Sequence, residues 1–155
     1  AKPAPKPSKK LKGSASAFKK LDGLDWRKEG RTLTYWLHRW VRLRDTEVMT
    51  NGRYGNCICC GRHKAFEQLE AGHFIRSRHM GTRWHEKNIN AQCSYCNRWL
   101  GGNELKYREG LIKKYGPGII DELEVEKKLN ARHPDAIYLK LRAVRYRMLC
   151  EGIEG

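Results

Sequence analysis

Two pairs of cysteines constrain the fold of this chain more than any other feature. Each pair is separated by two residues, with Cys57 and Cys60 in the first and Cys93 and Cys96 in the second. A Cys-x-x-Cys turn carries two sulfurs together, so two such turns can surround a tetrahedral zinc ion with four thiolates. Cys59 is the odd cysteine, although an exchange of register with it stays open. A closed four-sulfur site has no position for substrate, so we expect this zinc to be structural.

Length and charge narrow the class of protein. A chain of 155 residues suits one small domain that benefits from a metal. The formal net charge of +15 favours a polyanionic partner such as nucleic acid. No stretch approaches the roughly 20 apolar residues of a membrane span, so we expect an intracellular, cytoplasmic protein with no membrane partner. In a reducing compartment, paired cysteines bind metal more readily than they form disulfides.

The chain divides into four expected segments. They are a disordered basic tail (residues 1–20), an N-terminal amphipathic helix region (21–50), a zinc-bound module (51–103) and C-terminal helices (104–155). The tail holds seven lysines and no acidic residue, so it either follows DNA phosphates or only adds solubility.

Helical periodicity predicts the flanking elements. From Thr32 to about Asp45, one apolar face carries a tryptophan pair that we assign to the core; its members are Leu33, Trp36, Leu37, Trp40 and Val41. A helix capped by Asn103 should end at Gly116, and another should span about 118–129. The last helix should begin at 134–135. Its predicted apolar stripe is Ile137, Leu141, Val144 and Met148, which either packs on the domain or forms a dimer seam.

The segment between the cysteine pairs gives the order Cys, Cys, His, Asn, Cys, Cys, Asn. This order resembles the HNH, or ββα-metal, nucleases, in which two zinc knuckles clamp two strands and a helix around one catalytic metal. The resemblance sharpens to the NinG (Rap) recombination nucleases of lambdoid phages over residues 33–125. It rests on Cys57-x-x-Cys60-Gly61, Ala71-Gly72-His73, Glu86-x-Asn88-Ile89, Gln92-Cys93-x-x-Cys96-Asn97, Gly102-Asn103, Tyr107-Arg108, Leu111-Ile112, Gly116 and Ile120-Asp121-Glu122-Leu123-Glu124. It implies an α+β fold, a zinc-stabilised ββα-metal core with flanking helices.

The resemblance also implies roles for three residues. His73 corresponds to the general base that deprotonates water, which requires a neutral imidazole. Asn97 corresponds to a ligand of the catalytic cation, and its carbonyl oxygen suits Mg²⁺ or Mn²⁺. Asn88 corresponds to the middle asparagine of the motif, which more often holds the loop or the base in place than it touches metal.

Two positions depart from the HNH pattern. Gly72 stands where many HNH nucleases have an acidic metal ligand. Strand periodicity puts Glu70 on the same face, so we propose Glu70 as a ligand, with His79 and His85 as alternatives. Leu100 stands where a lysine is common, and Arg98 can supply that positive charge.

Basic residues beside the site are candidate DNA contacts. Besides Arg98 they are Arg76, Arg78, His79 and Arg83, all in the loop between the two expected strands. We assign Trp84 and Trp99 to the core around the zinc, although Trp84 could instead stack on an unpaired base at a junction. His38 and His63 lack motif partners, so we assign both to surface or packing roles.

Together these features predict a DNA endonuclease that hydrolyses phosphodiester bonds, and the resemblance to the NinG family implies that it acts on branched recombination intermediates, such as Holliday junctions and D-loops. It would use structural zinc and one Mg²⁺ or Mn²⁺ ion. Paired incision of a four-way junction would suit a homodimer. The first alternative is a non-catalytic zinc module that binds branched or single-stranded DNA, and the absent carboxylate at position 72 favours it. A second is an RNA-binding zinc protein, which leaves the His and Asn order unexplained.

Overall fold

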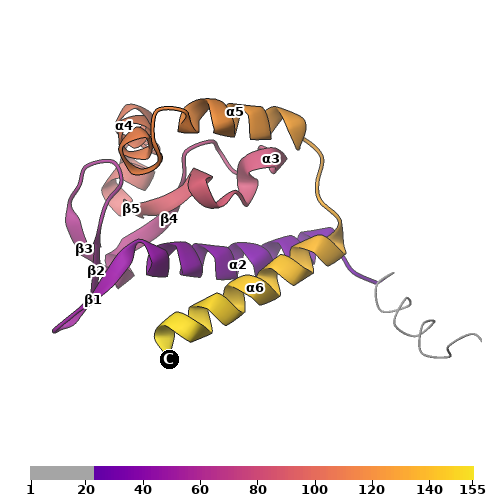
Figure 1. Ribbon diagram of the computed structural model, residues 1–155, viewed down its shortest axis with the longest axis horizontal. Coiled ribbons are helices and arrows are strands. Elements are labelled where there is room, and N and C mark those ends of the chain that lie inside the picture. The colour runs from indigo at the N-terminus through magenta and orange to yellow at the C-terminus, as the bar shows by residue number, and fades with distance from the viewer. Residues whose placement is uncertain (1–22) are drawn as a thin grey trace, which may run out of the picture.

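The computed structural model describes residues 23–155, so the predicted basic tail lies outside the described part of the chain. Its helices are α2 (Trp26–Arg44), α3 (Met80–Arg83), α4 (Glu104–Tyr115), α5 (Ile119–Leu129) and α6 (Ala136–Glu154). Its strands are β1 (Thr46–Met49), β2 (Gly52–Asn56), β3 (His63–Ala65), β4 (Leu69–His73) and β5 (Ile89–Cys93). β4 and β5 lie between two groups of helices, with α2 and α6 on one side and α3, α4 and α5 on the other (Figure 1). The predicted α+β class is confirmed.

Helix α2 is the long inner helix that the apolar periodicity predicts. It begins at Trp26, six residues before the predicted start, because the Asp25 side chain accepts a hydrogen bond from the Arg27 amide and caps the first turn. Leu33, Leu37 and Val41 are fully buried, and the predicted tryptophan pair packs against the same core. Every helix within residues 23–155 is too short or too polar to cross a membrane.

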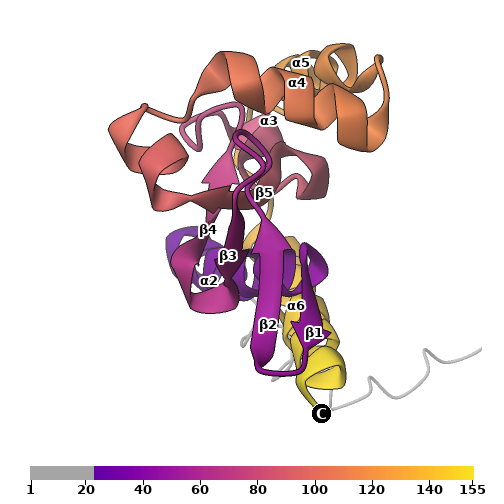
Figure 2. The same ribbon diagram turned by 90° about the vertical axis from the view of Figure 1, so that its left-hand side faces the viewer.

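The strands form two separate antiparallel sheets. β1, β2 and β3 make the first, and the β1–β2 hairpin extends below β4 and β5 and in front of α6 in Figure 2. β4 and β5 make the second, with Glu70 opposite Gln92 and Gly72 opposite Asn90. Residues 46–49 form β1 although we had assigned them to the N-terminal helix region. Three of these four residues are exposed, so the pairing is made by the backbone and leaves no alternating apolar pattern in the sequence.

Helices α4 and α5 form a second small core over the loop that follows β4. Its buried residues are Ile75, Tyr107, Leu111, Ile119, Ile120 and Leu123. Gly116 ends α4 with a positive φ of 97°, as predicted. The predicted cap at the other end is wrong. Asn103 precedes α4, but its side chain makes no capping bond and its Nδ2 lies 3.4 Å from Cys96 Sγ.

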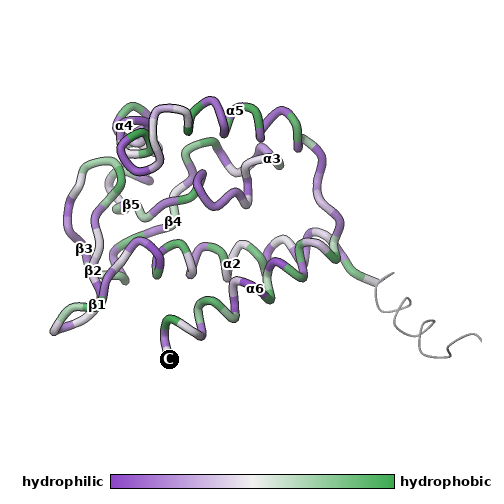
Figure 3. The backbone as a smooth tube through the Cα atoms, in the orientation of Figure 1, coloured by the Kyte–Doolittle hydropathy of each residue, from purple (hydrophilic) through white to green (hydrophobic). Residues whose placement is uncertain are grey.

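Helix α6 packs along α2 with a different face from the one that we predicted. The buried residues are Leu139, Ala143, Tyr146 and Cys150. The predicted stripe faces solvent instead, and Leu141 and Met148 are each 62% exposed. Figure 3 shows that hydrophobic residues recur along α6, including its C-terminal half. The sequence shows two apolar faces on this helix, and only the contact with α2 decides which of them is buried.

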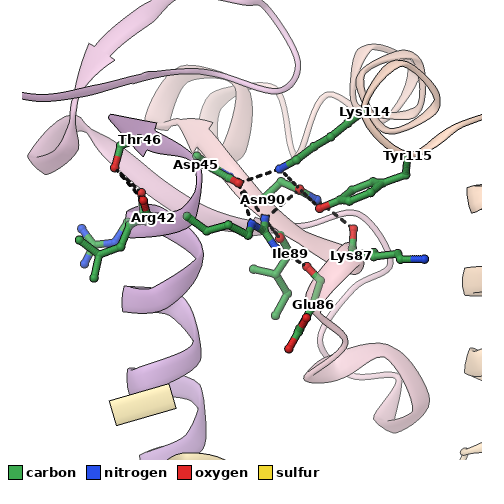
Figure 4. Close-up of polar contacts among 12 residues, drawn as sticks. Arg42, Asp45, Thr46, Glu86, Lys87, Ile89, Asn90, Lys114 and Tyr115 are labelled. Atoms are coloured by element: carbon green, nitrogen blue, oxygen red, sulfur yellow. Dashed lines mark hydrogen bonds and ion pairs between the residues drawn. The ribbon is translucent and has the colours of Figure 1, made fainter. Parts of the chain in front are cut away.

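A polar network joins the end of α2 to β5 and α4 (Figure 4). Asp45 pairs with Arg44 and with Lys114, at 2.7 Å each, and accepts a hydrogen bond from the Ala91 amide. Burial alone would raise the pKa of Asp45, but its hydrogen bonds and charge pairing with the two cations outweigh burial and lower it. Lys114 also donates to Asn90 Oδ1. The network therefore fixes the register of β5 against both flanking helices.

Candidate zinc and catalytic-metal site

The four predicted zinc ligands come together in space. The sulfur atoms of Cys57, Cys60, Cys93 and Cys96 all lie within 4.8 Å of one another. Cys60 Sγ and Cys93 Sγ are 3.8 Å apart, which equals the edge, about 3.8 Å, of a tetrahedron with Zn–S bonds of about 2.3 Å. Both the donor set and the spacing fit zinc. The cluster ties the turn after β2 to the end of β5.

Cys59 lies outside the cluster of four sulfurs and contacts Cys57 and Gln92. The contact between the two thiols lowers the pKa of Cys57 and raises the pKa of Cys59. Cys59 Sγ also lies 3.0 Å from Gln92 Nε2. The four grouped sulfurs, which leave out Cys59, have the register predicted from the Cys-x-x-Cys spacing.

Asn97 lies in a single π-helical turn, Tyr95–Trp99, that contains the last zinc ligand. Its Nδ2 donates to Glu70 Oε2 at 2.7 Å, and Arg98 pairs with Glu70 Oε1 at 2.6 Å. The structure thus brings together Glu70, Asn97 and Arg98, three of the predicted site residues. The turn ends at Leu100, and α4 begins only after two glycines, so the helix expected after the second knuckle is short.

Gly72 faces Asn97 and also Gln92, a residue that the sequence pattern does not mark as part of a site. A Cβ atom built on Gly72 would lie 2.0 Å from Gln92 Oε1 and 3.1 Å from Asn97 Oδ1. Gln92 is fully buried, and its Oε1 has no hydrogen-bond partner in the structure. The sequence does contain a clue, because Gln92 lies inside a strand of otherwise mostly apolar or small residues, next to a zinc ligand.

His73 ends β4, and its side chain points to the α2 side of the hairpin. Its Nε2 lies 2.8 Å from the Arg83 carbonyl oxygen, which can only accept, so Nε2 carries the proton and Nδ1 keeps a free lone pair. Burial lowers the pKa of His73, which keeps the imidazole neutral. The ring packs edge-on against His38 of α2, with centroids 5.3 Å apart. Gly72 and Asn97 lie on the other face of the hairpin.

Asn88 is fully buried and holds the loop between β4 and β5. Its Oδ1 accepts a hydrogen bond from the Ile75 amide, and its Nδ2 donates to the carbonyl oxygens of Ile75 and Thr82. All three bonds lie between 2.8 and 3.0 Å. These contacts give Asn88 the loop-holding role that the motif favours over direct metal contact.

The predicted DNA contacts lie in and around the same loop. Arg76 and Arg78 are exposed, whereas His79 and Arg83 are half-buried. His85, an alternative metal ligand, accepts a hydrogen bond from the Lys87 amide and so caps a short turn. The assignment to the core is wrong for Trp99, whereas Trp84 is in the core as predicted, although not in the part around the zinc. Trp84 is buried in the core between α2 and α6, and Trp99 is 83% exposed next to Arg98. A large aromatic residue beside a knuckle does not have to pack on it.

Comparison with known proteins identifies the family. The model of the family described as Bacteriophage Lambda NinG protein matches residues 5–151. The chain is 31% identical over 96 residues to protein ninG of Salmonella phage P22, and 32% identical over 92 residues to protein ninG of Escherichia phage lambda. These alignments cover 61% and 59% of this chain, but only 47% and 45% of the relatives, so the chain matches about half of their length. No solved structure matches the chain. Because the family model matches nearly the whole sequence, this chain belongs to the NinG family.

Proposed function

We propose that this protein is a structure-selective DNA endonuclease that hydrolyses phosphodiester bonds in branched recombination intermediates, such as Holliday junctions and D-loops. One observation carries the proposal. His73 is a neutral, half-buried histidine whose Nε2 is engaged by the Arg83 carbonyl, so Nδ1 is free to accept a proton. It directly follows Gly72. A Cβ atom built on Gly72 would lie 2.0 Å from Gln92 Oε1 and 3.1 Å from Asn97 Oδ1. The motif order of HNH nucleases and the net charge of +15 support the same conclusion.

In this reaction each group of residues would have a separate role. His73 Nδ1 accepts the proton of the attacking water, while the bond from Nε2 to the Arg83 carbonyl stabilises the imidazolium that forms. Asn97 Oδ1 would hold Mg²⁺ or Mn²⁺, with Glu70 orienting the Asn97 amide, and the ion when bound supplies positive charge for the pentacovalent phosphate and the leaving oxygen. The exposed Arg76 and Arg78 would bind flanking phosphates. The four-cysteine zinc site would hold β5 and the turn that carries Asn97 in register.

A second function, binding of branched or single-stranded DNA without cleavage, is favoured by a different observation. The His73 ring lies against His38 on the α2 face of the hairpin, whereas Asn97 contacts Glu70 on the other face. A base and a metal on opposite faces could act together only around the end of β4, where the strand stops at His73. The two candidates differ in one measurable property, which is metal-dependent nicking.

The test compares nicking of a labelled four-way junction with nicking of a matched linear duplex in Mg²⁺ or Mn²⁺. We expect the parent protein to nick the junction and His73→Ala to lose at least about 100-fold of that rate. Both proteins should bind the junction equally. His63→Ala is the matched control, because His63 is exposed at the edge of the first sheet, where it contacts Asn56 and Tyr54. Tight binding without nicking by the parent protein in either metal would establish the non-catalytic alternative.

A further inference from the structure

Gln92 has a buried carbonyl oxygen that no residue within 23–155 satisfies. Its Nε2 donates to the Gly102 carbonyl at 2.7 Å and lies 3.0 Å from Cys59 Sγ. Turning the amide over would bring its oxygen against the Gly102 oxygen, so these contacts fix the orientation of the group. Oε1 is therefore held towards Gly72 with no hydrogen-bond donor, although the residue is fully buried. A buried acceptor of this kind is ordinarily satisfied by an ion, a water molecule or a donor of the protein.

A second amide oxygen faces the same point. Asn97 donates through Nδ2 to Glu70, and this bond turns its Oδ1 the other way, towards Gly72. Both oxygens lie within 3.1 Å of the position that a Cβ atom on Gly72 would take. Two acceptors turned towards one point repel each other unless a cation or a donor lies between them. The Glu70 carboxylate beside Asn97 is already paired with Arg98, so the two amide oxygens are the groups that a cation would satisfy.

Gly72 is the residue that makes this arrangement possible. Any side chain at position 72 would collide with Gln92 Oε1, because even its Cβ would come within 2.0 Å of that oxygen. An acidic residue at position 72 and the Gln92 carbonyl at this point are therefore mutually exclusive. The departure from the HNH pattern at Gly72 is thus matched by an oxygen supplied from the opposite strand.

We propose that Gln92 Oε1 and Asn97 Oδ1 are two ligands of a hard divalent cation, with Gln92 replacing the acidic ligand that Gly72 cannot provide. Oxygen donors select Mg²⁺ or Mn²⁺ over softer metals. Since both ligands are neutral, the affinity should be modest, and a carboxylate in place of either oxygen should strengthen it. This inference deepens the proposed function, because it names ligands of the proposed catalytic metal, but cation binding can be measured without DNA.

The experiment measures Mn²⁺ binding to zinc-loaded protein by the loss of the free Mn²⁺ electron paramagnetic resonance signal. Gln92→Ala and Asn97→Ala should each weaken Mn²⁺ binding at least about tenfold. Gln68→Ala is the matched control, since Gln68 is an exposed glutamine just before β4, and its Mn²⁺ affinity should equal that of the parent. Zinc content and thermal unfolding of each variant show whether the fold is retained.

A reciprocal exchange keeps the test valid if Gln92→Ala is unstable. The double variant Gly72→Asp with Gln92→Ala moves the oxygen from one strand to the other, so it should bind Mn²⁺ at least as tightly as the parent. Gly72→Ala alone should displace the Gln92 amide and weaken binding. Parent-like Mn²⁺ affinity in folded Gln92→Ala and Asn97→Ala, or no Mn²⁺ binding by the parent at millimolar metal, would overturn the proposal, because a water molecule would then satisfy both oxygens.

The outcomes separate this proposal from the nuclease proposal. Mn²⁺ binding that depends on Gln92, without junction nicking, leaves the cation site standing and refutes the nuclease. Nicking that persists in both variants with unchanged Mn²⁺ affinity refutes the cation site and leaves the nuclease standing.

Discussion

At the scale of single residues, the pair His38 and His73 shows how the fold controls protonation. Burial, the neighbouring His73 and the positive charge of Arg42 lower the pKa of His38 to about 4. Among the residues from 23 onwards, none provides a hydrogen-bond partner for the buried Nε2 of His38, so none of them stabilises a charged ring through this atom. The pKa of His73 is lowered too. Because the two rings are in contact, a proton gained by one would repel a positive charge on the other. The base of the proposed reaction is thus kept neutral by its surroundings.

This pairing predicts acid sensitivity. The folded pKa of His38, about 4, lies below the value of 6.5 expected in the unfolded chain. Between these values the unfolded state binds more protons, so the contribution of His38 is complete above pH 6.5 and is lost as the pH falls towards 4. Between pH 7 and pH 5, the free energy of unfolding of His38→Phe should therefore fall by about 2 kcal/mol less than that of the parent. Guanidinium unfolding of both proteins, with His63→Gln as an exposed control, measures this difference. An identical pH dependence in parent and His38→Phe would contradict it.

At the scale of elements, the parts predicted correctly are those with a local pattern. The apolar face of α2, the strand that ends at His73, and helices α4 and α5 follow from periodicity and from glycine at helix ends. The features that the sequence does not predict depend on contacts between residues far apart in the chain. β1 is held by backbone pairing, Trp99 is exposed beside a knuckle, and α6 buries the stripe that contacts α2. Gln92 was missed because its role depends on Gly72 in the opposite strand, and no local pattern records such a pair.

The zinc site should control the stability of the elements around it. Cys93 ends β5, and Cys57 begins the turn after β2, so the cluster joins the two sheets through sulfur. Structural zinc sites in small domains contribute on the order of 10 kcal/mol. Chelation, or Cys93→Ser, should therefore melt the β4–β5 hairpin and its flanking turns rather than remove activity alone. Hydrogen exchange of the β5 amides, with and without zinc, measures this effect.

Cys150→Ser is the matched control for the zinc prediction. This cysteine is buried between α6 and α2, apart from the cluster, so its replacement should leave zinc content unchanged. Full protection of the β5 amides in zinc-free protein would show that the apolar cores alone hold the hairpin.

At the scale of the whole molecule, α6 presents a second apolar face that the described part of the chain does not cover. Ile137, Leu141, Val144 and Met148 recur at spacings of four, three and four residues, which is the pattern of a helical seam. Their exposed fractions run from 37% to 62%. A four-way junction requires two incisions on opposed strands, and a two-fold dimer presents two sites related in the same way. The position of the stripe, opposite the face that packs on α2, leaves it free to pair with a second copy.

We therefore expect a homodimer joined through α6, and Leu141→Lys should convert it to a monomer because the lysine places a charge in the middle of the seam. Sedimentation equilibrium measures the mass directly. Leu129→Lys is the matched control, since Leu129 is 74% exposed at the end of α5 and lies outside the stripe. The monomer should still nick simple branches while losing paired incision of the four-way junction, because one site suffices for a single cut. An unchanged mass for Leu141→Lys would exclude this seam, and paired incision by a proven monomer would show that the junction is cut in two independent events.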